Sequence, residues 1–481
     1  MSKFRASLLA IVAIAAIGIA VPPSAPAAAA DTAAVAAKKG KGKKKGKKVF
    51  TVCKFGCKYK TITKAVKKVK KRNSTIKVKP GTYVEGVILE GKEYNGLTIT
   101  GTKENPMKTV IEGENAKSPS GSLAQNGIEG IDVSGVTIKN LSVNNFATNG
   151  IFLRDSDAAD DDKTLDCSDY LVKNTYTSGN RAYNVFAFGC VGGRMTQNES
   201  TLTGDSAFYV GATPDQGENG ETTKLDHNVA YLNVQAFSGT NSRYMDIYAN
   251  DFFNNGIGLT PNTLDSEPYE PTEAGVIRNN DIFWNNLNYY LDGSPVQTVS
   301  NGLGEINGTT INFPTGIGIV MFGADGWTVK NNNIFGHYKW GTATFSDAVG
   351  NEGDDAISRN NQYLNNKMGR GGTDPNAYDF FVDGSGSGNC FSGNTSSTFD
   401  PVTDGEGNPI PAETARIYPT CPAPSNSGTG TSAGEESQFI DLASYVLTDP
   451  PENQQCSWTE TPHPPFEDYE PYMVEPGPSC P

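Results

Sequence analysis

Acidic side chains gather in four long segments of the sequence, where their oxygens could bind a hard cation. The groups are Asp155, Asp157, Asp160, Asp161, Asp162 and Asp166; Asp215, Glu218 and Glu221; Asp265, Glu267, Glu270 and Glu273; and Glu352, Asp354 and Asp355. Carboxylates are ligands that calcium prefers, and Asp157, Asp161 and Asp162 are the candidate metal ligands. Calcium would assist a lyase or stabilise a rim, and no cofactor is otherwise required. The alternative is a solvated acidic edge.

Other residues could supply acid–base chemistry. Asp205, in TGDSAFYVG, immediately precedes an apolar run and is the candidate catalytic carboxylate, although an aspartate there can simply cap a turn. A glycosidase needs two carboxyl groups roughly 5–10 Å apart. A lyase needs a base, for which Arg154, Arg181 and Lys173 are candidates. A histidine site is not expected, because the three histidines occupy different positions in the repeat.

Aromatic residues recur at matching places in the apolar runs. A strand period of two, with Ile151, Val185 and Phe208 inward, puts the next residue of each run on the outer face. The outward aromatics, and candidate substrate-binding residues, are Phe152, Phe186, Phe188 and Tyr209. Such a row can mark a binding groove, where aromatic faces would stack on sugar rings. The alternative is that the C-terminal tail or residues 288–314 cover the row.

An internal repeat indicates which elements position these side chains. An aliphatic residue is followed three positions later by asparagine, at Asn198, Asn228, Asn250, Asn280, Asn332, Asn360 and Asn394. A second asparagine recurs at Asn233, Asn255, Asn285 and Asn365. Between these turns lie short apolar pieces, three to a period, which is typical of a parallel β-solenoid. We expect the asparagines to stack, each amide bonding the backbone and the next asparagine.

The asparagine periodicity and the segment Gly386–Asn394, GSGNCFSGN, resemble the right-handed parallel β-helix repeat family, the pectate-lyase-like superfamily. The resemblance implies an all-β, right-handed parallel β-helix of about ten coils. In enzymes of this family, substrate lies along the outer face of the strand that contains GIFL, Gly150–Leu153. The beginning of the chain is also similar. Its apolar positions Ile62, Ala65, Val66 and Val69 lie on one helical face, and this amphipathic helix would cap the first coil.

The ends of the chain differ in composition from its body. Residues 1–30 have a basic start, an apolar core and a small-residue site before Asp31, the pattern of a secretory signal peptide. Residues 31–50 form an Ala/Lys-rich linker, which we expect to be disordered. The β-helix domain spans 51–421, and 422–481 is a Pro-rich irregular tail. We therefore expect a secreted, extracellular protein without a transmembrane segment, held loosely to the cell envelope by its linker.

Eight cysteines in an exported chain predict disulfides rather than metal thiolates. Stacked coils sit about 4.8 Å apart, within reach of a disulfide. That spacing supports a bond between Cys167 and Cys190, which lie about one repeat apart. The other pairings expected are Cys53–Cys57, Cys390–Cys421 and Cys456–Cys480.

Charge and motifs together define two classes of function. The formal net charge is −13, although Lys and Arg are concentrated before position 80, so the body is strongly acidic and nucleic acid is not an expected partner. One class is an exported monomer that binds, and as an enzyme cleaves, a polysaccharide or cell-envelope glycan by lyase or glycosidase chemistry. The other is a non-catalytic surface or matrix scaffold or adhesin.

Overall fold

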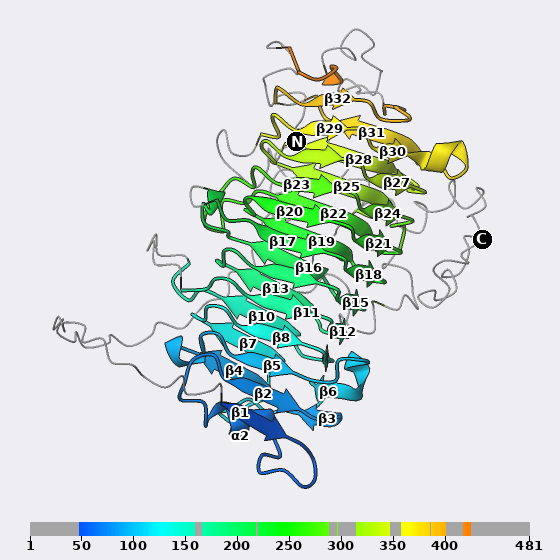
Figure 1. The fold of residues 1–481 in the computed structure, drawn as a ribbon. Coiled ribbons are helices and arrows are strands. Elements are labelled where there is room, and N and C mark those ends of the chain that lie inside the picture. Colours follow the sequence, from blue (N-terminus) through cyan, green and yellow to red (C-terminus); the bar gives the residue numbers. More distant parts are fainter. Residues whose placement is uncertain are drawn as a thin grey trace, which may run out of the picture.

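The computed structural model describes residues 48–158, 166–217, 220–287, 296, 314–346, 357–384, 386–400 and 417–424. Three long parallel sheets form the molecule, and the chain passes repeatedly from one to the next as it rises from the blue to the orange end (Figure 1). The predicted all-β parallel β-helix is therefore confirmed. In the described part of the chain, no helix combines the length and apolar character needed to span a membrane.

Each sheet is named here by its order along the chain. The first sheet consists of β1 (Val49–Val52), β2 (Thr75–Val78), β5 (Thr98–Thr100), β8 (Thr137–Lys139), β11 (Leu171–Lys173), β14 (Arg194–Thr196), β17 (Thr223–Asp226), β20 (Met245–Tyr248), β23 (Val276–Arg278), β26 (Thr328–Lys330), β29 (Gln362–Leu364) and β32 (Cys390–Ser392). The second sheet consists of β3 (Gly81–Val84), β6 (Thr109–Glu112), β9 (Ser142–Asn144), β12 (Tyr176–Ser178), β15 (Glu199–Thr201), β18 (Val229–Tyr231), β21 (Asp251–Phe253), β24 (Asp281–Phe283), β27 (Asn333–Phe335) and β30 (Lys367–Met368). The third sheet consists of β4 (Val87–Glu90), β7 (Ile128–Ile131), β10 (Ile151–Arg154), β13 (Val185–Phe188), β16 (Ser206–Gly211), β19 (Gln235–Thr240), β22 (Ile257–Asn262), β25 (Ile317–Phe322), β28 (Trp340–Phe345) and β31 (Tyr378–Val382).

The core follows from parallel, in-register stacking. In the first sheet, Ile138 of β8 lies beside Val172 of β11, which lies beside Met195 of β14. All three are fully buried, while their strand neighbours on both sides face outward or toward turns. Because side chains alternate along a strand, one inward position per short strand is enough to build a continuous apolar column.

Asparagine ladders close the turn between the first and second sheets, as predicted. Asn228 Nδ2 donates to Asn250 Oδ1 at 3.0 Å, and Asn250 Nδ2 donates to Asn280 Oδ1 at 2.9 Å. Each amide also donates to a backbone carbonyl, for example that of Leu225 from Asn250. The ladder satisfies turn groups that would otherwise be buried without partners.

Two members of the asparagine pattern were assigned wrongly. The ladder residue after Asn332 is Asn366, reached by a 3.0 Å bond, whereas Asn360 donates to Asp325 from an exposed turn. Asn365, expected in the second ladder with Asn233, Asn255 and Asn285, instead precedes Asn366 with φ of 55°. The sequence NN offers two candidates, and only the register of β29 decides which one faces inward.

The N-terminal region contains the helix α2 (Ile62–Val66), whose Ile62, Ala65 and Val66 are buried against β1, β2 and β4. Glu85 accepts from the free N–H groups of Ile62 and Thr63 at 2.8 and 2.9 Å, which fixes the start of this helix. Three 3₁₀ turns are also described, η1 (Lys92–Tyr94), η2 (Pro106–Lys108) and η5 (Gly369–Gly372). The predicted coil number and the capping role of α2 stay predictions.

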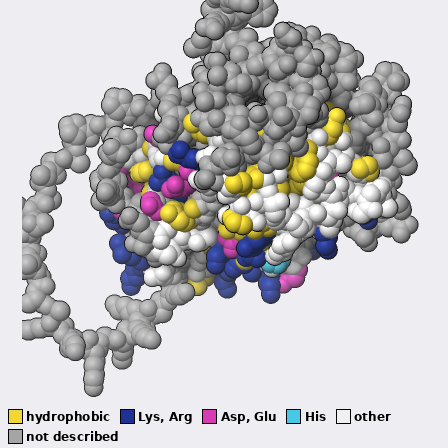
Figure 2. Space-filling model, turned by 90° about the horizontal axis from the view of Figure 1, so that it is seen from above, with side chains coloured by type: hydrophobic (Ala, Val, Ile, Leu, Met, Phe, Trp, Pro, Cys, Tyr) yellow, Lys and Arg dark blue, Asp and Glu magenta, His cyan; other side chains and the backbone are white. Residues whose placement is uncertain are grey.

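Three disulfides join neighbouring parts of the coil stack. They are Cys53–Cys57, Cys167–Cys190 and Cys390–Cys421, all of which were expected, although the coil spacing supported only Cys167–Cys190. The expected Cys456–Cys480 bond lies outside the described residues, as do the signal peptide, most of the basic linker and most of the C-terminal tail. Seen from above, Lys and Arg side chains gather along one edge of the described surface (Figure 2).

Candidate functional site

Four buried titratable side chains meet on the outer face of the third sheet. Asp205 immediately precedes β16, Tyr209 lies within β16, and Tyr183 lies just before the neighbouring strand β13. Glu267 comes from the segment after β22 and reaches back over β16. Their exposed fractions are 4% for Asp205, 3% for Tyr209, 6% for Tyr183 and 9% for Glu267. We call these four residues the carboxyl–tyrosine cluster.

Asp205 accepts hydrogen bonds from three side chains. Ser206 Oγ donates at 2.6 Å and Gln235 Nε2 at 3.2 Å, both to Oδ1, and the phenol of Tyr183 also bonds this carboxylate. Burial raises the pKa of Asp205 to about 6, and these three donors oppose that rise. Asp205 is therefore mainly ionised at neutral pH, but it can accept a proton within the physiological range.

Glu267 has the opposite protonation preference. Tyr209 Oη lies 3.0 Å from Oε2 and 3.1 Å from Oε1. Burial raises the pKa of Glu267 to about 8; the Tyr209 hydrogen bond lowers it, and the nearby charge of Asp205 raises it. At neutral pH Glu267 is mainly protonated. The cluster thus pairs one ionised carboxylate with one carboxylic acid, a combination that enzymes use for acid–base work.

Tyr183 and Tyr209 pack against each other, and each forms a hydrogen bond with one carboxyl group of the cluster. Their ring centroids are 4.8 Å apart, and the pKa of each phenol is raised well above its usual value, first by burial and then by the nearby carboxylates. Both phenols remain protonated, so they act as fixed hydrogen-bond donors. Tyr183 serves Asp205 and Tyr209 serves Glu267.

The segment that carries Glu267 is itself fastened to the third sheet. Asn241 Nδ2 donates to the carbonyls of Leu264 at 2.8 Å and of Glu267 at 2.7 Å, while Asn241 Oδ1 accepts from Leu264 N at 3.0 Å. Asn241 is completely buried. This residue therefore sets the position of the Glu267 backbone.

The aromatic row has the predicted register but not the predicted exposure. Phe152 pairs with Phe186, and Phe186 with Tyr209, and their ring centroids are 4.4 and 4.7 Å apart. Phe152 is 2% exposed and Phe186 6% exposed, so the expectation of an open row is wrong. Phe188 is partly buried against the same group. Alternation fixes the face to which a side chain points, whereas covering depends on segments remote in sequence.

The two candidate arginines, Arg154 and Arg181, lie differently with respect to Asp205. Arg154 Nε pairs with Glu129 at 3.2 Å. The register places Arg154 level with Gly211, five residues along β16 from Ser206. The rise of a strand makes that offset about 17 Å. Arg181 is exposed beside Ala182. The register therefore separates Arg154 from Asp205, whereas Arg181 directly precedes Ala182, whose carbonyl accepts from Asp205 N at 3.1 Å.

The metal prediction is not tested. Asp157 is exposed and accepts from Ser156 Oγ at 3.3 Å, while Asp161 and Asp162 lie outside the described residues. Within the described ranges, no group of three or more His, Cys, Asp or Glu side chains is placed to hold a metal ion. Calcium binding stays an expectation.

Sequence reasoning missed Glu267 and Tyr183 as partners of Asp205. Glu267 is visible in the sequence only as one acid among several in its segment. Nothing in the local pattern singles it out, because its contact with Tyr209 spans 58 residues. Tyr183 precedes its strand, outside the alternating run in which aromatic residues were sought.

Comparisons with known proteins identify the fold. No protein-family model and no curated protein sequence matches the chain. The mannuronan C-5 epimerase AlgE6 A-module of Azotobacter vinelandii is similar in structure, with 14% identity, a TM-score of 0.50, and coverage of 71% of this chain and 82% of that one. The corresponding AlgE4 A-module gives 13% identity, a TM-score of 0.47, and 71% and 83% coverage. Pectate lyase Pel9A gives 14% identity, a TM-score of 0.37, and coverage of 74% of this chain and 78% of that one.

At such identities the likeness extends to the fold alone. The three parallel sheets and the likeness to the AlgE6 module show that the chain has a parallel β-helix fold. That fold hosts several chemistries, so activity has to be argued from the carboxyl–tyrosine cluster.

Proposed function

We propose that this is an exported protein that binds a polysaccharide along the outer face of the third sheet and hydrolyses it at the carboxyl–tyrosine cluster. One observation carries the proposal: Asp205 and Glu267, far apart in sequence, share one buried cluster in which their pKa values differ, at about 6 and about 8. Buried carboxyl groups with raised pKa values cost folding free energy, so they are more frequent at functional sites than elsewhere. The disulfides are consistent with export.

The roles follow from the protonation states. Glu267 donates its proton to the glycosidic oxygen as the bond from that oxygen to the anomeric carbon breaks. Asp205 accepts a proton from a water molecule as the oxygen of that water adds to the anomeric carbon. The anomeric carbon thus gains the hydroxyl group of the water, and the leaving oxygen gains the proton of Glu267. Tyr209 then stabilises the carboxylate left on Glu267, because its phenol already points at both oxygens.

Access is part of this mechanism. All four side chains of the cluster are buried, so the proposed hydrolysis requires the segments that cover the cluster to move aside while Tyr209 stays bonded to Glu267. The same burial favours a second candidate, a non-catalytic scaffold in which the cluster and the aromatic row only stabilise the outer layer. The two functions differ in whether any glycan is cleaved.

The test is cleavage of a panel of neutral and acidic polysaccharides, with calcium and with chelator. Reducing ends and the absorbance of unsaturated uronate are followed together. Hydrolysis predicts reducing ends without the absorbance, and their loss, by about 100-fold or more, in Asp205→Asn and Glu267→Gln. Glu270→Gln is the matched control, because it makes the same change on an exposed side chain of the same segment.

Other outcomes would overturn the proposal. Calcium-dependent absorbance would establish a lyase instead. No cleavage of any polysaccharide by a folded sample would favour the scaffold. Equal activity in Glu267→Gln and Glu270→Gln would remove Glu267 from the chemistry.

A further inference from the structure

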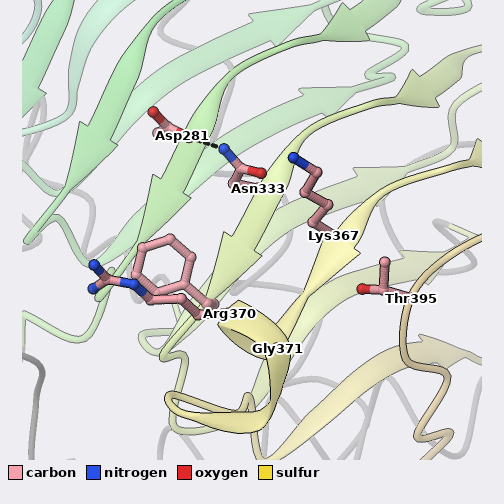
Figure 3. A pocket seen from close by; sticks show the side chains of 7 residues that line it. Asp281, Asn333, Lys367, Arg370, Gly371 and Thr395 are labelled. Carbon is pink, nitrogen blue, oxygen red and sulfur yellow. Dashed lines mark hydrogen bonds between the residues drawn. The ribbon is translucent and has the colours of Figure 1, made fainter.

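A hollow on the second sheet lies on a different face from the carboxyl–tyrosine cluster. Its volume is about 460 Å³, and its lining includes Asp281, Asn333, Phe335, Lys367, Arg370 and Thr395 (Figure 3). Pockets of roughly 300–1,000 Å³ are the usual size for small ligands. The residues come from β24, β27, β30 and η5, and from the segment after β32.

The parallel register aligns one residue from each of four coils in a polar row, of which Asp281, Asn333 and Lys367 line the hollow. Asp251 lies beside Asp281, Asp281 beside Asn333, and Asn333 beside Lys367. These neighbours are separated by about 4.8 Å, the spacing between strands. In order along the row, Asp251 and Asp281 carry carboxylates, Asn333 carries an amide that donates to Asp281, and Lys367 carries an ammonium group. It therefore offers acceptors at one end and a cation at the other.

A second cation lies at the edge of the hollow. The guanidinium of Arg370 lies 5.3 Å from the ring centroid of Phe335, and the ring of Phe335 continues a stack through Phe283 to Phe253, with centroids 5.0 and 5.1 Å apart. Arg370 has φ of 47° and ψ of 46°, a left-handed conformation that is uncommon for a residue other than glycine. The turn η5 holds this side chain over the aromatic stack.

These two cations are notable on an acidic protein. Lys367 and Arg370 are both exposed, and among the described residues no carboxylate oxygen lies within 4.0 Å of either charged group, although the charge of Arg370 acts on Asp374 and opposes the rise that burial causes in its pKa. By contrast, Arg194 and Arg278 on the first sheet, and Arg359 just before β29, each pair with an aspartate within 3 Å. A pocket with two exposed cations, an amide that is held by Asp281, and carboxylate acceptors is suited to an anion that also carries hydroxyl groups.

We propose that the hollow beside β24, β27 and β30 binds an acidic sugar unit through its carboxylate. Lys367 and Arg370 contact the carboxylate, Asn333 contributes its amide, and Asp281 accepts from a ring hydroxyl. The site would hold an acidic glycan on a face separate from the cluster on the third sheet. This inference does not depend on whether that cluster cleaves polysaccharide.

The experiment measures binding of D-glucuronate to the full chain by calorimetry or by NMR line shifts. D-glucose serves as the neutral analogue and inorganic phosphate as an anion without a sugar ring. We expect glucuronate to bind at least about tenfold more tightly than glucose or phosphate, because charge-assisted hydrogen bonds and hydroxyl contacts both contribute. Binding should weaken as salt is raised, since both cations are exposed.

Variants assign the binding to the two cations. Lys367→Gln and Arg370→Gln should each weaken glucuronate binding by about tenfold, equivalent to about 1.4 kcal/mol, and leave the weak glucose binding unchanged. Lys224→Gln, which removes an exposed lysine of β17 on the first sheet, is the control and should bind like the parent. Thermal unfolding confirms that each variant is folded.

Three results would overturn the inference. One is no detectable glucuronate binding at tens of millimolar. Another is equal affinity for phosphate and glucuronate, which would reveal a simple anion site. The last is unchanged glucuronate affinity in Lys367→Gln and Arg370→Gln, which would place any binding elsewhere.

Discussion

The phenol of Tyr209 lies within 3.1 Å of both carboxyl oxygens of Glu267, joining a core strand of the third sheet to a segment 58 residues later. Tyr209 reaches outward from β16, and Asn241 fixes the backbone from which Glu267 reaches back. This contact makes the segment after β22 part of the wall of the candidate site. It also keeps the carboxyl group of Glu267 buried, and this burial raises its pKa.

Tyr209→Phe tests what this contact contributes. The change keeps the ring and removes the hydroxyl, and the described residues provide no other donor to the Glu267 carboxyl. We expect a loss of about 1–3 kcal/mol in the free energy of unfolding, measured with urea. Tyr231→Phe is the control, because its 2.9 Å bond to Glu199 is only partly buried, and it should cost less. An equal loss in both variants would contradict a special role for the Tyr209 contact.

The pH dependence of stability should reveal Glu267. Its pKa is about 8 in the folded chain against an ordinary value of 4.5, so the folded state holds its proton where the unfolded state releases it. Between these two values the folded state binds more protons, and the free energy of unfolding therefore falls as pH rises, by up to about 1.4 kcal/mol per pH unit.

Glu267→Gln removes that contribution. Between pH 5 and pH 8 the variant should lose less stability than the parent, and it should gain stability relative to the parent as pH rises. Urea unfolding at several pH values measures this, with Glu270→Gln as the exposed control. Parallel curves for the parent and Glu267→Gln would show that Glu267 titrates normally.

The asparagine ladder should respond strongly to truncation. Asn250 donates to Leu225 O and Asn280 Oδ1, and accepts from the amide groups of Asn228. Asn250→Ala leaves several buried partners unsatisfied, and we expect it to cost about 3 kcal/mol or more. Asn331→Gly is the control: Asn331 is exposed with φ of 56°, a conformation that glycine adopts readily. Similar losses in both variants would argue against the ladder as the source of stability.

The disulfides should differ in the stability they provide. The bonded cysteines are 23 residues apart in Cys167–Cys190 and 4 residues apart in Cys53–Cys57. The chain-entropy argument predicts a loss of about 3.5 kcal/mol when the longer loop is opened and about 2 kcal/mol for the shorter. Paired Cys→Ala substitutions and urea unfolding measure the two losses. A greater loss at Cys53–Cys57 would reverse the expected order.

Local sequence patterns predicted the parts of the molecule that repeat. The repeat predicted the inward residue of each short strand, the outward direction of Phe152, Phe186 and Tyr209, and most ladder asparagines. These features were predictable because the same pattern of residues recurs from coil to coil. Cys167–Cys190 was predictable for the same reason, because its partners lie one coil apart. Where the chain offered two adjacent asparagines, Asn365 and Asn366, the pattern did not determine which one enters the ladder.

Only the tertiary structure decided what covers the outer faces and which remote residues meet there. Successive ladder asparagines are 30, 52 and 34 residues apart from Asn250 to Asn366, because the coils carry segments of different length. No fixed spacing in the sequence therefore relates Asp251, Asp281, Asn333 and Lys367, although the register aligns them in one row. Glu267 meets Tyr209 through a segment outside the repeat. The alternation of side chains along a strand determines the face to which each side chain points. Whether that side chain is buried, and which residues it contacts, depends on how the whole chain stacks.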